Sequence, residues 1–181
     1  MSDRLEIRLA GMGGQGMILA GVLLADAAIR DGKNAVQTQS YGPEARGGAS
    51  RSEVILSDRE IDYPEVIQAD VVLCMSQQAC DRYAHDLKRS GLLIVDSGHV
   101  QRMPTTLAVR ADLTAWAVEA TGREITANVL ALGFLVGLTD IVSREALQET
   151  VLARAPAGTQ ELNLKALERG FAEAEALREG T

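Results

Sequence analysis

Residues 11–16 read GMGGQG, and residues 5–10, which precede them, read LEIRLA. The first, third and sixth positions of GMGGQG are glycines, which is the spacing G-x-G-x-x-G. The apolar run before the glycines predicts a strand, and the nearly uncharged stretch after them predicts a helix over residues 16–29. A glycine turn between a strand and a helix indicates an α/β fold.

The same spacing occurs in dinucleotide-binding proteins, where the turn and the start of the helix hold a pyrophosphate. NAD binding also requires an acidic residue near the end of the second strand, to hold the ribose hydroxyls. Residues 34–41, NAVQTQSY, predict that strand and contain no acid. Asp31 comes before the strand, and Glu44 follows it beyond a proline. The sequence therefore argues against NAD, while the loop can still bind an anion or a carbonyl oxygen.

A second glycine-rich loop, YGPEARGGAS at residues 41–50, follows the second predicted strand. Loops after neighbouring parallel strands meet at one edge of a sheet, so the two loops face one crevice if their strands are adjacent. Arg46 offers a forked cation for a carboxylate or phosphate, and Gln15 offers an amide. Together the loops predict a surface for an anion or a partner, although each loop alone also fits an ordinary turn.

The rest of the chain alternates strands with helices and then becomes helical. Residues 50–58 predict a strand that turns back on residues 57–61, SDREI, as a hairpin, so we expect a mixed sheet. Further strands are predicted at 69–76, 91–98 and 105–111, and helices at 76–90, 112–122, 125–140, 143–156 and 160–178. We therefore predict one domain over residues 1–181, a three-layer α/β/α sandwich with a mostly parallel but mixed sheet and a helical C-terminal part.

The charge and the apolar runs exclude several classes of partner. The net charge is −7, and such an acidic surface repels nucleic acid and anionic lipid. The longest uncharged apolar run, residues 125–138, is shorter than the roughly 20 residues that a membrane span needs. The N-terminus is too charged for a signal peptide, so we expect a cytoplasmic protein without membrane or nucleic-acid contacts.

Residues that could carry chemistry are few. Cys74 and Cys80 are the only cysteines, and their spacing fits no zinc or iron–sulfur site, so we predict reduced thiols. His85 and His99 are predicted to lie on the surface. Residues 96–99, DSGH, place Asp, Ser and His together, but neighbours within one loop do not make a catalytic triad. The sequence predicts no catalytic residue and no metal site, and favours a binding surface.

Two nearly uncharged helices, at residues 17–29 and 127–138, leave one question open. Gly133 and Gly137 are four residues apart, so another backbone can approach that face closely. Either a partner covers one of these helices, or both fill the core of the domain.

Four stretches carry a resemblance to a known family: GMGGQGMILAGVLLADAAIRDG, TQSYGPEARGGASRSEVILSDREI, ADVVLCMSQQA and GLLIVDSG. They resemble the gamma subunit of 2-oxoacid:ferredoxin oxidoreductases, and the stretch YGPEARGG is most similar to the 2-oxoglutarate type. The resemblance extends from the first predicted strand to LNLKALERGF in the last helix.

The resemblance implies an accessory subunit that is inactive alone. Such an enzyme converts a 2-oxoacid and CoA to acyl-CoA and CO2 and reduces ferredoxin. Thiamine diphosphate, Mg and iron–sulfur clusters are then expected in the alpha, beta and delta-type partner subunits, with none bound by this chain. Versions that use pyruvate or branched-chain 2-oxoacids stay open, as does a stand-alone dinucleotide-binding module.

Under this resemblance, the two glycine loops shape the CoA side of the active site or contact the partner subunits. The expected residues are Gly11, Gly13, Gly14, Gln15, Gly16, Tyr41, Gly42, Pro43, Glu44, Arg46, Gly47 and Gly48.

Overall fold

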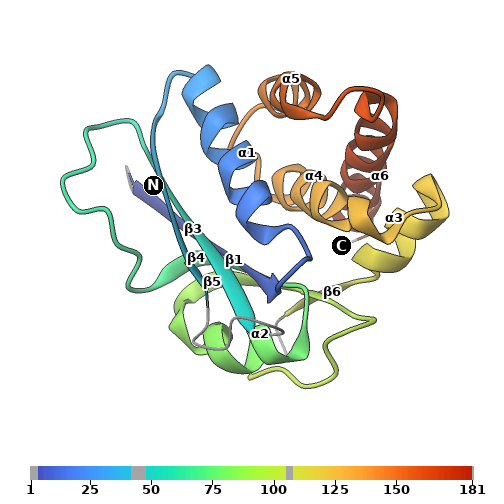
Figure 1. The fold of residues 1–181 in the computed structure, drawn as a ribbon. Helices are drawn as coiled ribbons and strands as arrows, with labels where there is room; N and C mark the ends of the chain where they lie inside the picture. The colour runs from blue at the N-terminus through green and yellow to red at the C-terminus, as the bar shows by residue number, and fades with distance from the viewer. Residues whose placement is uncertain (1–3, 42–47, 105–107, 181) are drawn as a thin grey trace.

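The computed structural model describes residues 4–41, 48–104 and 108–180, and its described strands form one sheet of six (Figure 1). The spatial order is β2-β3-β1-β4-β5-β6. Strand β3 runs antiparallel to both β1 and β2, while the β1–β4, β4–β5 and β5–β6 pairs are parallel. The predicted mixed, mostly parallel sheet is therefore confirmed. The strands are β1 (Arg4–Met12), β2 (Asn34–Tyr41), β3 (Ala49–Ser57), β4 (Ala69–Cys74), β5 (Leu87–Asp96) and β6 (Val109–Ala111).

The helices form two unequal layers on the sheet. Helices α1, α3, α4, α5 and α6 lie on one side, while the short α2 lies on the other (Figure 1). This confirms the three-layer sandwich. The bounds are α1 (Met17–Arg30), α2 (Gln77–Tyr83), α3 (Leu113–Thr121), α4 (Ala127–Thr139), α5 (Arg144–Arg154) and α6 (Gln160–Glu179), with 3₁₀ turns η1 (Ala84–Asp86) and η2 (Glu124–Thr126).

Alternation along the strands divides the core between these layers. Residues such as Ile7, Leu9 and Leu73 pack with α1 and α4 in the larger cluster. Their neighbours Val72 and Leu93 pack in a smaller cluster on the α2 side. In the described residues, no helix is both long enough and apolar enough to cross a membrane.

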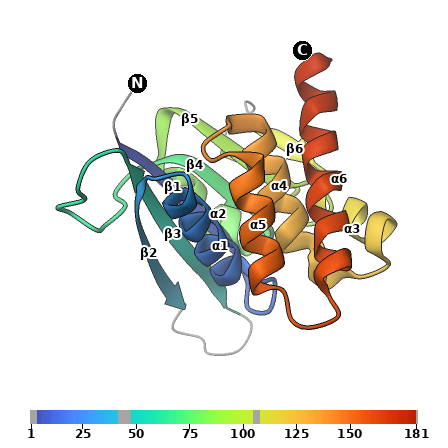
Figure 2. The ribbon, with the colours of Figure 1, turned by 90° about the horizontal axis from the view of Figure 1, so that it is seen from above.

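Helix α4 is buried inside the helical layer, so this uncharged helix fills the core and is covered by other helices of the same chain. Helices α1, α5 and α6 stand side by side over it in Figure 2, and α6 crosses it at very short range. A Cβ atom at Gly133 would lie 2.5 Å from the carbonyl oxygen of Leu167, and one at Gly170 would lie 2.2 Å from that of Leu130. The close backbone approach predicted from Gly133 and Gly137 is therefore made by α6 of the same chain.

The predicted hairpin between residues 50–58 and 57–61 is wrong. Strand β3 already pairs along its length with β1 on one side and β2 on the other, so it has no free edge for a third strand. The residues that follow it, 58–68, form an irregular connector to β4 instead.

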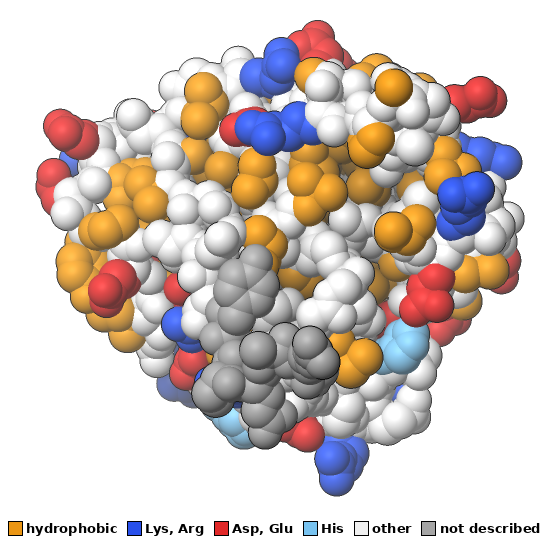
Figure 3. Space-filling view, viewed as in Figure 1, with side chains coloured by type: hydrophobic (Ala, Val, Ile, Leu, Met, Phe, Trp, Pro, Cys, Tyr) orange, Lys and Arg blue, Asp and Glu red, His pale blue; other side chains and the backbone are white. Residues whose placement is uncertain are grey.

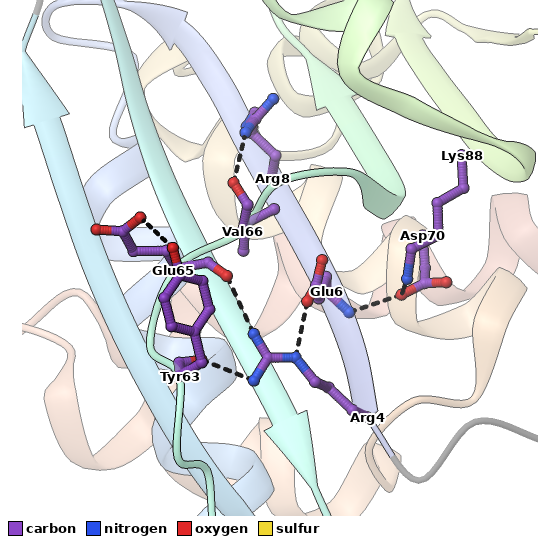
Figure 4. Close-up of polar contacts among 8 residues, drawn as sticks. All are labelled: Arg4, Glu6, Arg8, Tyr63, Glu65, Val66, Asp70 and Lys88. Atoms are coloured by element: carbon purple, nitrogen blue, oxygen red, sulfur yellow. Dashed lines mark hydrogen bonds and ion pairs between the residues drawn. The ribbon is translucent and has the colours of Figure 1, made fainter.

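Arginines of β1 hold this connector in place (Figure 4). Arg4 donates to the carbonyl oxygens of Tyr63 and Glu65 at 2.7 and 3.0 Å, and Arg8 donates to that of Val66 at 3.3 Å. The Arg8 side chain is only 2% exposed and also pairs with the Glu53 carboxylate at 2.7 Å. A buried pair of opposite charges of this kind satisfies charges that would otherwise be costly to desolvate.

The helix predicted over residues 76–90 is too long. Helix α2 ends at Tyr83, and residues 87–90, LKRS, belong to β5. Lys88 pairs with Asp70 of β4 at 2.8 Å, and Asp86 pairs with Arg8 at 2.5 Å. The first is a cross-strand pair between β5 and β4, and the second fixes the 3₁₀ turn η1 that precedes β5. Together they oppose continuation of the helix through a segment of helix-forming composition, because tertiary contacts outweigh intrinsic propensity.

Candidate functional site

The candidate site lies at the carboxyl ends of β1 and β4, where the connections that follow these two strands cover opposite faces of the sheet. The β1–α1–β2 connection covers one face of the sheet and the β4–α2–β5 connection covers the other (Figure 1). The carboxyl ends of β1 and β4, which are neighbours, therefore diverge into loops on opposite sides. This is the place where open α/β sheets bind ligands.

Two glycines in the loop after β1 have backbone conformations that require glycine. Gly14 and Gly16 have positive φ angles of 95° and 73°. A Cβ atom on Gly16 would also lie 2.4 Å from Nδ2 of Asn128 in α4. The loop thus turns tightly into α1 and lies against α4.

Gln15 spans the two strands at this point. The backbone N–H of Met12 donates to its Oε1 at 2.8 Å, and its Nε2 donates to the carbonyl oxygen of Met75, directly after β4, at 3.0 Å. The side chain therefore connects the end of β1 to the residue after β4, and both its amide oxygen and its amide nitrogen are already hydrogen-bonded within the chain.

The first and second strands are not adjacent, because β3 lies between them. The two loops nevertheless meet, since β1 and β2 are both antiparallel to β3 and therefore run in the same direction. Ser50 pairs with Gly11 on one side and with Tyr41 on the other. The N–H of Gly13 donates to the carbonyl oxygen of Gly48 at 3.3 Å. Of the predicted second-loop residues, Gly42, Pro43, Glu44, Arg46 and Gly47 lie outside the described residues.

Two cavities flank the glycine loop. One, of about 640 Å³, is lined by the loop, the start of α2, His99 and Glu124, and the other, of about 250 Å³, is lined by Gln15, Met75, Thr114 and Ile125 among others. They share Gly14, Gln15 and Glu124, and we call them together the crevice. Two exposed apolar side chains line it: Met12 is 45% exposed and Ile125 is 77% exposed.

A buried carboxylate supports one wall of the crevice. Asp96, at the end of β5, is 0% exposed and lies 2.8 Å from Nδ1 of His99. It also accepts a hydrogen bond from the hydroxyl of Thr114. Ser97 donates to Asp112 instead of to His99, so the DSGH residues form an Asp–His pair and no triad. His85 and His99 are both exposed, as predicted.

Sequence reasoning missed several residues of this site. Asn128 is buried against the glycine loop, donates to the carbonyl oxygen of Gly16 at 3.4 Å and accepts from the N–H of Val129 at 2.9 Å. Its signal was present, since it is the one polar residue inside the stretch ANVLALGFLVGL. Glu124 and Thr114 carried no comparable signal, because they reach the crevice only through the packing of α3 and η2.

The two cysteines lie beside this region as free thiols. The hydrogen bond that they share raises the pKa of Cys74 well above its usual range, with burial adding to the effect, and lowers the pKa of Cys80. Among the residues that the structure describes, no group of three His, Cys, Asp or Glu side chains could hold a metal ion.

Comparison with known proteins identifies the family of the chain. Residues 6–173 match the family model described as pyruvate ferredoxin/flavodoxin oxidoreductase. The 2-oxoglutarate synthase subunit KorC of Methanocaldococcus jannaschii is 49% identical over 96% of this chain and 96% of its own. These matches favour the gamma-subunit interpretation over a stand-alone dinucleotide-binding module.

Solved structures show the same fold. The gamma subunit of a keto/oxoacid ferredoxin oxidoreductase from Geobacter sulfurreducens has a TM-score of 0.86 and 50% identity, covering 96% of this chain and 97% of that chain. A 2-oxoglutarate:ferredoxin oxidoreductase from Magnetococcus marinus has a TM-score of 0.85, covering 97% of this chain but 32% of that chain. At 23% identity, the second likeness shows the fold alone.

Proposed function

The chain belongs to the pyruvate ferredoxin/flavodoxin oxidoreductase family, as a gamma-type subunit of a 2-oxoacid:ferredoxin oxidoreductase, and we propose that its enzyme converts 2-oxoglutarate and CoA to succinyl-CoA and CO2. The observation that carries the choice of substrate is the 49% identity, over nearly the full length of both chains, to a subunit of a 2-oxoglutarate synthase. Pyruvate and branched-chain 2-oxoacids are the alternatives that a substrate panel has to test.

In this proposal, the crevice forms part of the CoA side of the active site. Its position at the carboxyl ends of β1 and β4 supports this role, as does the N-terminus of α1 at Met17, where N–H groups favour an anion. Arg46, in the loop that follows β2, would bind a phosphate of CoA with its forked guanidinium. The chain itself breaks no bond of the 2-oxoacid.

Among the described residues, none are grouped to hold the iron–sulfur clusters of such an enzyme. Its only two cysteines share a hydrogen bond with each other, and the described residues contain no cluster of metal ligands. We therefore propose that thiamine diphosphate, Mg and the iron–sulfur clusters are bound by alpha, beta and delta-type partners, which pass electrons to ferredoxin. The free thiols support a cytoplasmic complex.

Exposed apolar surface supports a partner interface. Hydrophobic side chains gather across the middle of the face in Figure 3, while charged side chains lie mostly toward its edges. Leu19 and Ile29 of α1 are among the exposed large hydrophobic residues, together with Met12 and Ile125 at the crevice. Patches of this kind mark protein contacts more often than free surface.

The test is to purify the complex through a tag on this chain, without oxygen, from its own host. Viologen reduction is then assayed with CoA and a panel of 2-oxoacids. We expect larger partner subunits in the eluate and reduction that depends on both 2-oxoglutarate and CoA. A chain that elutes alone, or a complex that prefers pyruvate, would contradict the proposal.

Replacing Arg46 tests the proposed phosphate contact. In the assembled enzyme, Arg46→Ala should raise the apparent KM for CoA about tenfold or more, the loss of one charge-assisted contact, with little effect on the KM for the 2-oxoacid. Arg89→Ala is the matched control, because Arg89 is exposed and lines a separate cavity at the start of β5. An equal effect of both variants would remove the assignment of Arg46.

A further inference from the structure

The Asp96–His99 pair has the arrangement of an acid–base group, and in the described part of the chain His99 makes no hydrogen bond to a serine or cysteine. Asp96 is fully buried and accepts from the Thr114 hydroxyl, so its position is fixed by the end of β5 and the start of α3. It lies 2.8 Å from Nδ1 of His99. A buried acceptor at this place holds the proton on Nδ1, which leaves the lone pair of Nε2 for a ligand.

His99 is half-exposed and lines the same cavity as the glycine loop. The serines nearby are already used in other ways. Ser97 donates to Asp112, and the Ser76 hydroxyl oxygen accepts the N–H of Ala79 at 3.2 Å as the cap of α2. Within the described part of the chain, the pair therefore has no serine positioned for it to activate, and the group it acts on has to come from the ligand.

The walls of the crevice indicate which part of a ligand reaches His99. The lining residues that the structure describes include no lysine or arginine. Gln15 and Gln77 already use both ends of their amides within the chain, which leaves the amide of Gln78 for a ligand. Such a lining suits an uncharged arm with amide groups, whereas phosphates require cations or free backbone N–H groups. The carboxylate of Glu124 on the same wall disfavours a phosphate further.

We propose that His99, oriented by Asp96, is the base that deprotonates the thiol of CoA. The inference rests on the proposed function, which supplies CoA as the co-substrate. In this step the S–H bond breaks, the proton moves to Nε2 of His99, and the electron pair stays on sulfur as a thiolate. The Asp96 carboxylate stabilises the imidazolium that forms, and the thiolate is the nucleophile for the acyl group held by the partner subunits.

The decisive measurement is the pH dependence of kcat/KM for CoA in the assembled complex. His99→Asn keeps an N–H that can donate to Asp96 but removes the base. Base catalysis contributes about 10²–10⁴-fold, so we expect kcat/KM for CoA to fall about 100-fold at pH 7. A thiol with a pKa of about 8.5 is about 3% ionised at pH 7 and about three quarters ionised at pH 9, so the defect should shrink about tenfold at pH 9.

The ionisable groups around His99 do not produce this pattern by themselves. Asp96 contacts Nδ1 of the ring, Glu124 lines the same cavity, the neighbouring Ser97 donates to Asp112, and the Arg102 guanidinium pairs with Asp81. These groups are common to the unmodified and the His99→Asn complex, so their effect cancels when the two complexes are compared at the same pH. The recovery at high pH is therefore assigned to ionisation of the CoA thiol.

Two further measurements separate a base from a binding or structural residue. Desulfo-CoA lacks the thiol, so its inhibition constants for the His99→Asn complex and for the unmodified complex should agree within threefold. The amount of CO2 released in a first turnover without CoA should also be unchanged. His85→Asn is the matched control, since His85 is exposed and lines a different cavity.

Three results would overturn the inference. These are a defect that is the same at pH 7 and 9, a parallel loss of desulfo-CoA inhibition, and a loss of CO2 release in the first turnover. If the unmodified complex turned over 2-oxoacids without any need for CoA, the proposed function itself would be overturned. The two failures are therefore distinguishable.

Discussion

At the scale of single residues, the glycines of GMGGQG differ in why they are needed. Gly14 and Gly16 have positive φ angles, whereas Gly13 does not, and a Cβ atom on Gly13 would meet nothing within 4 Å. Gly16 is the most constrained of these three, because a Cβ atom there would also overlap the Asn128 side chain. One sequence pattern thus combines a residue required by backbone geometry and packing with one that leaves space for a ligand or partner.

Gly16→Ala should destabilise the chain by about 1–3 kcal/mol, because it adds left-handed backbone strain and a clash with Asn128. Gly13→Ala should change the free energy of unfolding by less than about 1 kcal/mol, since its surroundings are open. Urea unfolding of the two purified variants measures both values. Equal losses would show that the Asn128 contact does not constrain the loop.

At the scale of elements, α4 and α6 form the tightest helix pair of the molecule. Gly133 on α4 and Gly170 on α6 let the two backbones approach, and the Cβ position of Gly170 lies 2.2 Å from the carbonyl oxygen of Leu130 and 2.7 Å from the amide nitrogen of Phe134. Backbone atoms cannot swing aside as a flexible side chain can. The pair therefore depends on the absence of a single methyl group, and α4 in turn supports the glycine loop through Asn128.

Gly170→Ala should cost about 1–3 kcal/mol or more, because it overpacks a rigid helix contact and forces α4 and α6 apart. Thermal unfolding followed by circular dichroism measures the loss. Gly180→Ala is the control, since its Cβ atom would lie 3.4 Å from the nearest atom, an ordinary contact. A Gly170→Ala variant as stable as the control would contradict the close crossing.

At the scale of the whole molecule, the two ends of the parallel strands have different surroundings. The crevice, with Ile125 at 77% exposure, lies at the carboxyl ends of β1 and β4. The connector from β3 to β4, with Ile67 at 70% exposure, lies at their amino ends. The proposed function places the partner subunits at the crevice. The two isoleucines therefore form a matched pair for locating the interface.

Ile125→Glu should weaken assembly about tenfold or more, because it places a charge where an apolar side chain would be buried against a partner. Ile67→Glu should leave assembly unchanged, and both variants should fold, because both positions are exposed in the single chain. Recovery of partner subunits with tagged variants, titrated against concentration, measures the effect. Loss of assembly with Ile67→Glu alone would move the interface to the connector.

Much of the fold could be predicted because its signals are local. The glycine turn, the apolar alternation of β1 and the Ser143 cap of α5, which accepts the N–H of Ala146 at 3.1 Å, each act within a few residues. The wrong predictions involve long-range contacts. Residues 87–90 form a strand because Lys88 pairs with Asp70, and residues 57–61 form no hairpin because β3 is paired on both edges.

By itself, the sequence determined the α/β class, the glycine turn, the uncharged helix and the family, because these depend on the order and periodicity of residues along one segment. Only the tertiary structure decided that β3 separates the first two strands, that α6 covers α4, and that His99, paired with Asp96, lines the same cavity as the glycine loop. These facts depend on which distant segments pack together. That choice results from the burial and pairing energies of the whole chain, which no local pattern contains.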